Sequence, residues 1–95
     1  MKMLQTFLDV ATAHEGRLSR VESYEIGRSQ LHSSNGSGHL TVKQDHIEVE
    51  LLVWDSGDAE LNYGQPGAAT FEHHNVSTGA EVSALVERAL EIAGV

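Results

Sequence analysis

Cysteine is absent from this chain of 95 residues, so it offers no disulfide, no thiolate nucleophile and no cysteine-bound zinc. Proline occurs once, and aromatic residues make up only 5% of the sequence. No apolar run approaches the roughly 20 residues that a membrane-spanning helix requires, and the N-terminal residues do not form the apolar core of a signal peptide. We therefore expect a cytoplasmic protein with a single domain over residues 1–95 and no contact with a membrane.

Basic residues are also scarce: Lys and Arg total 6, against 14 Asp and Glu, for a formal net charge of −8. A protein that binds nucleic acid needs a footprint of lysine and arginine, so this balance argues against such a partner. All but one of the basic residues precede residue 44, and carboxylates dominate the stretch between Lys43 and Arg88. These are Asp45, Glu48, Glu50, Asp55, Asp58, Glu60, Glu72, Glu81 and Glu87. We expect one part of the surface to be strongly negative.

Amphipathic helices are predicted near both ends of the chain. Residues 3–15 place apolar side chains at helical spacing, and Gly16 follows as a predicted C-cap. Near the other end, Thr78 and Glu81 match a capping box, and the helix that they begin ends at Gly94. Its apolar stripe consists of Val82, Leu85, Val86, Ala89 and Ile92 or Ala93.

The sequence between these helices predicts antiparallel strands. The predicted strands are residues 18–28, 39–42, 46–54, 58–63 and 69–76. The first alternates weakly, as is typical of an edge strand, and residues 32–38 form a loop. A turn at Gln44 and Asp45 sets Leu40 opposite Val49. We expect an α+β fold, a two-layer sandwich in which a meander of four to five strands carries both helices on one face.

The stretch VWDSGDAEL, residues 53–61, determines which way the single tryptophan faces. A two-residue turn would place Val53 opposite Glu60, and so would bring charge onto the apolar face. A three-residue loop over residues 55–57, with Gly57 in the left-handed conformation, instead pairs apolar residues with one another. The resulting pairs are Val53 with Ala59, Leu51 with Leu61 and Val49 with Tyr63. We therefore predict the three-residue loop.

This register leaves a second sheet face, which both helices avoid and which we expect to be open. It carries Glu48, Glu50, Leu52 and Trp54 on one strand, beside Asp58, Glu60 and Asn62 on the next, with Asp55 in the loop. A tryptophan and a leucine among carboxylates are typical of an anchor that binds a basic partner. In the alternative interpretation, Trp54 folds over Leu52 or under a terminal loop and only adds to the packing.

No pattern of residues indicates catalysis or a cofactor. His73 and His74 are adjacent, so on a strand they point to opposite faces and cannot share a metal ion. Asp58 and Glu60 lie on one strand face, but no pocket is implied there that would raise a carboxyl pKa for acid–base work. We therefore expect that this protein is not an enzyme and that it has no catalytic, metal-binding or cofactor-binding residue.

The segment VWDSGDAEL resembles the core of the TriTu family of bacterial immunity proteins, which has a Trp, an acidic residue, Ser and Gly in such a hairpin. The layout is similar over most of the chain. An N-terminal helix precedes the strands of HLTVKQDHIEVELL, and FEHHNVSTGAEVSALVERAL leads into a C-terminal helix. The loops rich in Gly, Ser and His and the few lysines depart from the family pattern.

The resemblance implies a cytoplasmic immunity protein that binds one copy of a cognate toxin. Those toxins are TreTu-type ADP-ribosyltransferases, carried on Rhs or type VI secretion effectors, which use NAD to modify elongation factor Tu. The immunity protein would be monomeric when free, would occlude the NAD or substrate cleft of the toxin, and would need no cofactor. Trp54, Asp55 and Gly57 match the motif.

Two other classes stay open on the sequence alone. One is an acidic DNA mimic of the anti-restriction or anti-CRISPR type, whose carboxylates should follow the spacing of phosphates. The other is a structural module that associates with itself through the edge strand at residues 18–28.

Overall fold

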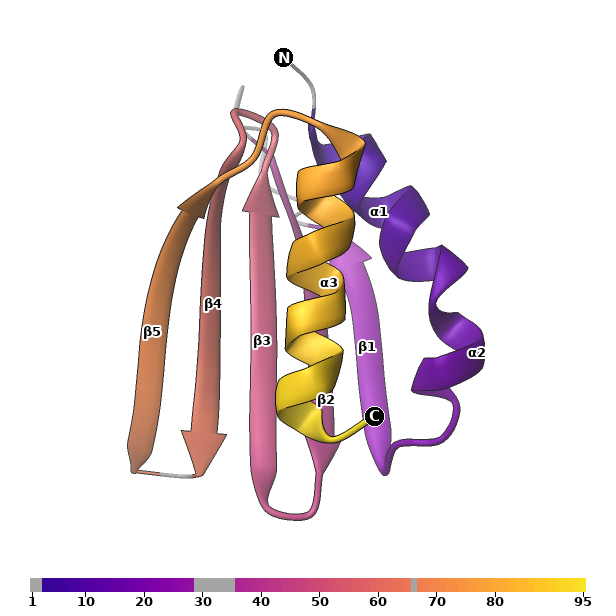
Figure 1. Ribbon diagram of the computed structural model, residues 1–95, viewed down its shortest axis with the longest axis vertical. Helices are drawn as coiled ribbons and strands as arrows, with labels where there is room; N and C mark the ends of the chain where they lie inside the picture. The colour runs from indigo at the N-terminus through magenta and orange to yellow at the C-terminus, as the bar shows by residue number, and fades with distance from the viewer. Residues whose placement is uncertain (1–2, 29–35, 66) are drawn as a thin grey trace.

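The computed structural model describes residues 3–28, 36–65 and 67–95, which form a sheet with helices on one side (Figure 1). The elements are α1 (Met3–Ala13), α2 (Glu15–Leu18), β1 (Ser23–Arg28), β2 (Ser37–Gln44), β3 (Ile47–Trp54), β4 (Asp58–Gln65), β5 (Ala68–Asn75) and α3 (Gly79–Ala93). All five strands pair antiparallel in the order β1-β2-β3-β4-β5. This is the predicted α+β meander. None of the helices within the described ranges is long and apolar enough to cross a bilayer.

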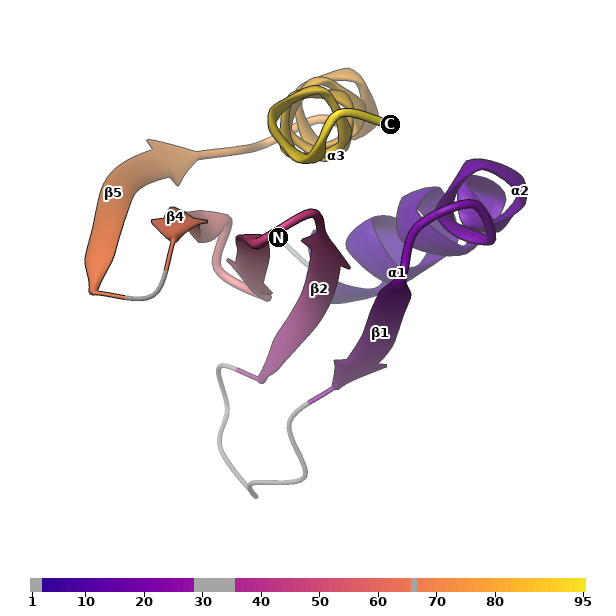
Figure 2. The same cartoon turned by 90° about the horizontal axis from the view of Figure 1, so that it is seen from below.

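Figure 2 shows that α1, α2 and α3 all lie on the same side of the sheet. The core fills the space between them and the central strands. It is made by Phe7 of α1, by most of the inward side chains of β2, β3 and β4, and by Val86 and Leu90 of α3, all of them almost fully buried. Gly38 of β2 leaves room for the ring of Phe7, because a Cβ there would lie 2.8 Å from that ring. Burial of such apolar side chains is the main favourable term in folding.

The N-terminal helix ends earlier than predicted, and Gly16 is not its C-cap. The helix α1 stops at Ala13, and the chain turns at His14 before the single turn of α2, which contains Gly16. This turn places Leu18 in the core with no exposed surface. The predicted strand at residues 18–28 is therefore wrong in its first part, and β1 begins at Ser23. Its place at the edge of the sheet is confirmed.

The β2–β3 turn also differs from the prediction. Asp45 and His46 form it, both with positive φ, at 50° and 72°, as a two-residue hairpin turn of type I′ requires. Leu40 therefore faces Leu51 and not Val49. This change of two residues keeps every side chain on its predicted face, because side chains in a strand alternate with a period of two. Of the predicted loop at 32–38, residues 37 and 38 belong to β2 and residues 32–35 lie outside the described ranges.

The β3–β4 hairpin is threaded as predicted. Gly57 has a φ of 98°, and its N–H donates to the carbonyl oxygen of Trp54 at 2.9 Å. Val53 pairs with Ala59, Leu51 with Leu61 and Val49 with Tyr63. The inward members of these pairs are buried, apart from the partly buried Tyr63.

The last helix keeps its predicted ends. The Oγ1 of Thr78 accepts a hydrogen bond from the N–H of Glu81, and Gly94 ends the helix with a φ of 79°. The capping box closes one residue early, since the Glu81 carboxylate accepts from the N–H of Ser77 at 2.9 Å. This backbone hydrogen bond is the main reason that the pKa of Glu81 lies below its usual value. Leu90 joins the predicted apolar stripe in the core.

Candidate partner-binding surface

The sheet surface that points away from the helices is called the open face. It takes every second residue of each strand, as the register and the alternation of burial show. Its members are Ser23, Glu25 and Gly27 of β1; Ser37, His39, Thr41 and Lys43 of β2; Glu48, Glu50, Leu52 and Trp54 of β3; Asp58, Glu60, Asn62 and Gly64 of β4; and Ala69, Phe71, His73 and Asn75 of β5. The sequence predicted the β3 members and Asp58, Glu60 and Asn62 of β4, and the register adds the others.

Trp54 and Leu52 both lie on the open face and are partly exposed. Neither belongs to the core that the helices cover. Trp54 faces Ser37 of β2 at the end of its strand, and Leu52 lies between His39 and Glu60. The indole is therefore on the side of the sheet that the sequence predicted, and it is partly exposed.

Phe71 adds an aromatic side chain that the sequence analysis did not single out. It lies on β5 opposite Asn62, and 72% of its surface is exposed. An isolated exposed phenylalanine is common on protein surfaces, but here Leu52 and Trp54 share the same face. The sequence signal was the alternation of residues 69–76, and only the pairing of β5 with β4 identifies which members face outward.

The carboxylates of the open face surround these apolar side chains. Glu48 and Asp58 are each 52% exposed at the side chain, and the Nζ of Lys43 and the Nε2 of His73 lie 3.9 Å from their respective carboxylates. Glu50 accepts a long hydrogen bond of 3.4 Å from the amide of Asn62. Such exposed, loosely paired charges add little stability, but together they produce a negative potential.

Glu25 of β1 enlarges the negative area beyond what the sequence predicted. Its carboxylate lies 3.0 Å from the Nε2 of His39. The carboxylates of the predicted negative run are divided between the two sides of the molecule. Glu72, Glu81 and Glu87 lie on the side of the helices and not on the open face. The strongly negative part of the surface is thus smaller than the run in the sequence.

Glu72 illustrates this division. On the helix side of β5, its carboxylate accepts hydrogen bonds from Arg88 of α3, from Tyr63 at 2.7 Å, and lies 2.9 Å from His74. The hydrogen bond from Arg88 is the main reason that the pKa of Glu72 is lowered to about 2, with His74 and Tyr63 adding to it. This cluster joins β5 to α3 beside the core. His73, the neighbour of His74, points to the open face, so the two histidines lie on opposite faces, as the sequence predicted.

Asp55, a predicted partner-binding residue, is engaged in the fold. Its Oδ1 accepts a hydrogen bond from the backbone N–H of Leu4 at 3.1 Å, and its carbonyl oxygen accepts one from Met3. Its own N–H donates to the carbonyl oxygen of Gly36 at 2.9 Å. The residue therefore links the start of α1 to the chain entering β2.

Gly57 has a similar structural role in the Trp-Asp-Ser-Gly hairpin. Its carbonyl oxygen accepts a hydrogen bond of 2.8 Å from the N–H of Val76, just before α3. A Cβ at this position would lie 2.3 Å from the carbonyl oxygen of Val76, so only glycine fits. Two of the motif positions thus build the fold, whereas Trp54 lies on the open face and is partly exposed.

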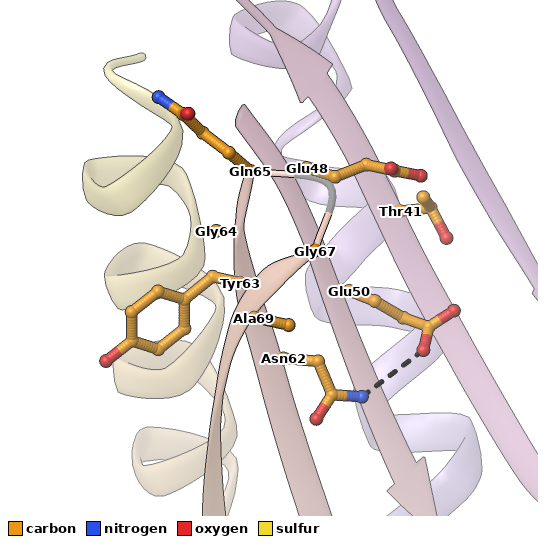
Figure 3. A pocket seen from close by; sticks show the side chains of 9 residues that line it. All are labelled: Thr41, Glu48, Glu50, Asn62, Tyr63, Gly64, Gln65, Gly67 and Ala69. Atoms are coloured by element: carbon orange, nitrogen blue, oxygen red, sulfur yellow. Dashed lines mark hydrogen bonds between the residues drawn. The ribbon is translucent and has the colours of Figure 1, made fainter. Parts of the chain in front are cut away.

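A hollow lies in the open face beside Glu48 and Glu50 (Figure 3). Its volume is about 230 Å³, and the loop between β4 and β5 forms one side. The lining residues are Thr41, Glu48, Glu50, Asn62, Tyr63, Gly64, Gln65, Gly67 and Ala69. Figure 3 shows the Tyr63 ring pointing away, toward the helices, so the lining near Tyr63 is backbone.

No protein-family model, curated protein or solved structure matches this chain. Within the described ranges, no three His, Asp or Glu side chains are grouped so that they could hold a metal ion. The functional conclusion therefore depends on the open face and on the hairpin that presents Trp54.

Proposed function

We propose that this protein is an immunity protein, which binds and neutralises a cognate interbacterial toxin through its open face. The toxin would be an ADP-ribosyltransferase of the TreTu type, and the complex would contain one copy of each chain. The immunity protein would occlude the NAD or substrate cleft of the toxin in the cytoplasm of the producing bacterium. It would act as a stoichiometric inhibitor, with no catalytic step of its own.

The observation that carries this proposal is the combination of apolar and acidic side chains on a sheet face without helices. Trp54, Leu52 and the 72% exposed Phe71 supply apolar contact area. Tryptophan is frequent among residues that dominate binding energy, and such residues are usually ringed by groups that exclude water. Here the surrounding groups are carboxylates: Glu48, Glu50, Asp58 and Glu60.

Charge complementarity favours a basic partner. A domain that binds a dinucleotide offers positive charge to the phosphates, and a negative face is attracted to the same region. The resemblance of residues 53–61 to the TriTu core supports the same class of partner. Asp55 contributes to this surface through the fold, because the loop that it anchors holds β3 and β4 in the register that places Trp54 on the open face.

The test uses a candidate TreTu-type toxin domain sought among the neighbouring reading frames, in a co-expression rescue assay and in calorimetric titration. Trp54→Ala is expected to weaken binding by about 30-fold or more, as for other binding hot spots. Tyr24→Ala is the matched control, because Tyr24 is an exposed aromatic residue on the helix side of β1. It is expected to bind like the parent protein.

Charge is tested separately. The double change Glu50→Lys and Glu60→Lys is expected to slow association and to abolish most of its salt dependence, whereas Glu91→Lys on α3 leaves both unchanged. The proposal is wrong if folded variants of the open face rescue cells and bind as tightly as the parent. Competition by duplex DNA for the same partner would instead favour the DNA-mimic class.

A further inference from the structure

The hollow in the open face exists because one strand position lacks a side chain. Gly64 of β4 lies between Glu48 of β3 and Ala69 of β5, in the row where the open face would otherwise carry a side chain. Its φ is 141°, and a Cβ there would lie 2.5 Å from the carbonyl oxygen of Ala68. A larger residue is therefore excluded, and the hollow is a fixed feature of the hairpin.

The chemistry of the lining favours a cation. The carboxylates of Glu48 and Glu50 stand on one side, as Figure 3 shows, with the hydroxyl of Thr41 next to them. Among the described lining residues there is no lysine or arginine. Lys43, the nearest base on this face, reaches Glu48 only at 3.9 Å.

Asn62 provides a second, independent indication. Its amide nitrogen is directed to Glu50, and its Oδ1 is buried without a hydrogen-bond partner within the described part of the chain. A buried acceptor without a hydrogen-bond partner is uncommon and costs stability. A ligand rich in donors at the adjoining hollow would offset that cost after a small rotation of the amide.

The size of the hollow limits what can occupy it. At about 230 Å³ it is smaller than the usual 300–1,000 Å³ of small-molecule and cofactor sites. It is suited to the end of one side chain. Arginine carries five N–H donors in a plane that matches carboxylates, and it is enriched at protein interfaces.

We infer that the hollow receives the guanidinium of an arginine on the partner protein. The carboxylates of Glu48 and Glu50 would hold it, with Thr41 and Asn62 as neutral acceptors. This inference rests on the proposed function in that it takes the open face as the docking surface. It adds the residue type that the toxin must present there, next to the exposed Phe71, which lies opposite the lining residue Asn62.

The inference is tested without the toxin, by titrating the ¹⁵N-labelled protein with N-acetylarginine amide. Saturable shifts are expected at the amides of Gly64 and Gly67, with a dissociation constant of roughly 1–10 mM, as suits a single charge-assisted contact in water. N-acetylcitrulline amide, which has the same shape without the charge, is expected to produce none. Equal shifts with citrulline or with N-acetyllysine amide, or none with arginine, would overturn the inference.

Two variants locate the effect. Ala69→Leu fills the hollow from an exposed position and is expected to abolish the arginine shifts, whereas Thr70→Leu, its neighbour on the other face, is expected to keep them. Glu48→Gln with Glu50→Gln is expected to weaken the arginine complex at least tenfold. Arginine shifts that persist in the folded Ala69→Leu protein would contradict a site in the hollow.

Toxin binding then separates the two proposals. Ala69→Leu is expected to weaken the complex about tenfold, less than Trp54→Ala, because one contact is lost and the rest of the face remains. If Trp54→Ala weakens toxin binding while Ala69→Leu does not, the open face is the docking surface but the hollow is unused. If neither variant matters, the proposed function has failed, whatever the arginine titration gives.

Discussion

The carboxylate of Asp55 accepts a hydrogen bond of 3.1 Å from the backbone N–H of Leu4, which lies 51 positions earlier in the chain. The first N–H groups of any helix lack partners within the helix, and a carboxylate also interacts favourably with the positive end of the helix dipole. Asp55 therefore caps α1 from the tip of the β3–β4 hairpin. The same loop that turns Trp54 outward holds the N-terminal helix against the sheet.

Asp55→Ala is expected to destabilise the protein by about 1 kcal/mol, as loss of a helix N-cap does elsewhere. Asp55→Asn keeps an oxygen that can accept from Leu4 and should retain most of that stability. Urea unfolding measures both. Asp9→Ala, which removes only an exposed hydrogen bond from Gln5, serves as the control. Equal stability of the Ala and Asn variants would contradict the capping role.

Gly57→Ala is expected to cost about 3 kcal/mol or more, because strain at a positive φ adds to a clash with the backbone of Val76. Gly94→Ala provides the comparison. Gly94 also has a positive φ, but its Cβ would meet nothing within 4 Å, so only the conformational cost of about 1 kcal/mol is expected. Thermal unfolding followed by circular dichroism distinguishes the two, and similar losses would show that Val76 can move aside.

His46→Gly is expected to stabilise the protein by about 0.5–1 kcal/mol. His46 has a φ of 72° in the β2–β3 turn, where glycine is the preferred second residue after Asp or Asn. Part of the gain is offset by the greater freedom of glycine in the unfolded chain. Unfolding in urea tests this, and Ile47→Gly, one residue further on in β3, is expected to destabilise instead. A loss of stability in His46→Gly would show that this turn is not strained.

Glu72 should make stability depend on pH in the acid range. Its pKa is lowered from the usual 4.5 to about 2 in the folded protein, chiefly by the hydrogen bond from Arg88. The unfolded state therefore binds more protons between these values, and stability falls as the pH falls from about 4.5 through 2.

Urea midpoints measured from pH 6 to pH 2 test this linkage. The urea midpoint of Glu72→Gln is expected to lie below that of the parent protein above pH 4.5, and the difference between the two midpoints is expected to shrink toward pH 2. Tyr63→Phe, which removes one of the donors to Glu72, is expected to show a smaller difference over the same range. A gap between Glu72→Gln and the parent that stays constant over the whole range would mean that Glu72 does not titrate as inferred.

Much of the sheet could be predicted because its signals are local. The three-residue loop before Asp58 was predictable, since only that loop pairs Val53 with Ala59 and keeps charge off the inner face. The ends of the strands were harder to predict from the sequence. Nothing in the order of residues 18–28 indicates that Leu18 leaves the strand to enter the core, because that burial depends on the distance from α1 to the sheet.

The β2–β3 turn was missed for a related reason. Asp-His does not signal a turn with two positive φ angles as strongly as Asn-Gly does. Phe71 and the hollow at Gly64 were missed because each is defined by its neighbours across the sheet. Asn62 lies beside Phe71, and Glu48 beside Gly64, only once β4 has paired on both sides.

The sequence by itself determined which side chains share a face, because the alternation of a strand is fixed by backbone geometry and survives a change of register by two residues. The sequence thereby placed Trp54 on the sheet face that points away from the helices. Which residues become neighbours on that face was decided by the tertiary structure, since pairing brings together groups far apart in the chain. The carboxylates around Leu52, the ring of Phe71 and the space over Gly64 form one surface for that reason.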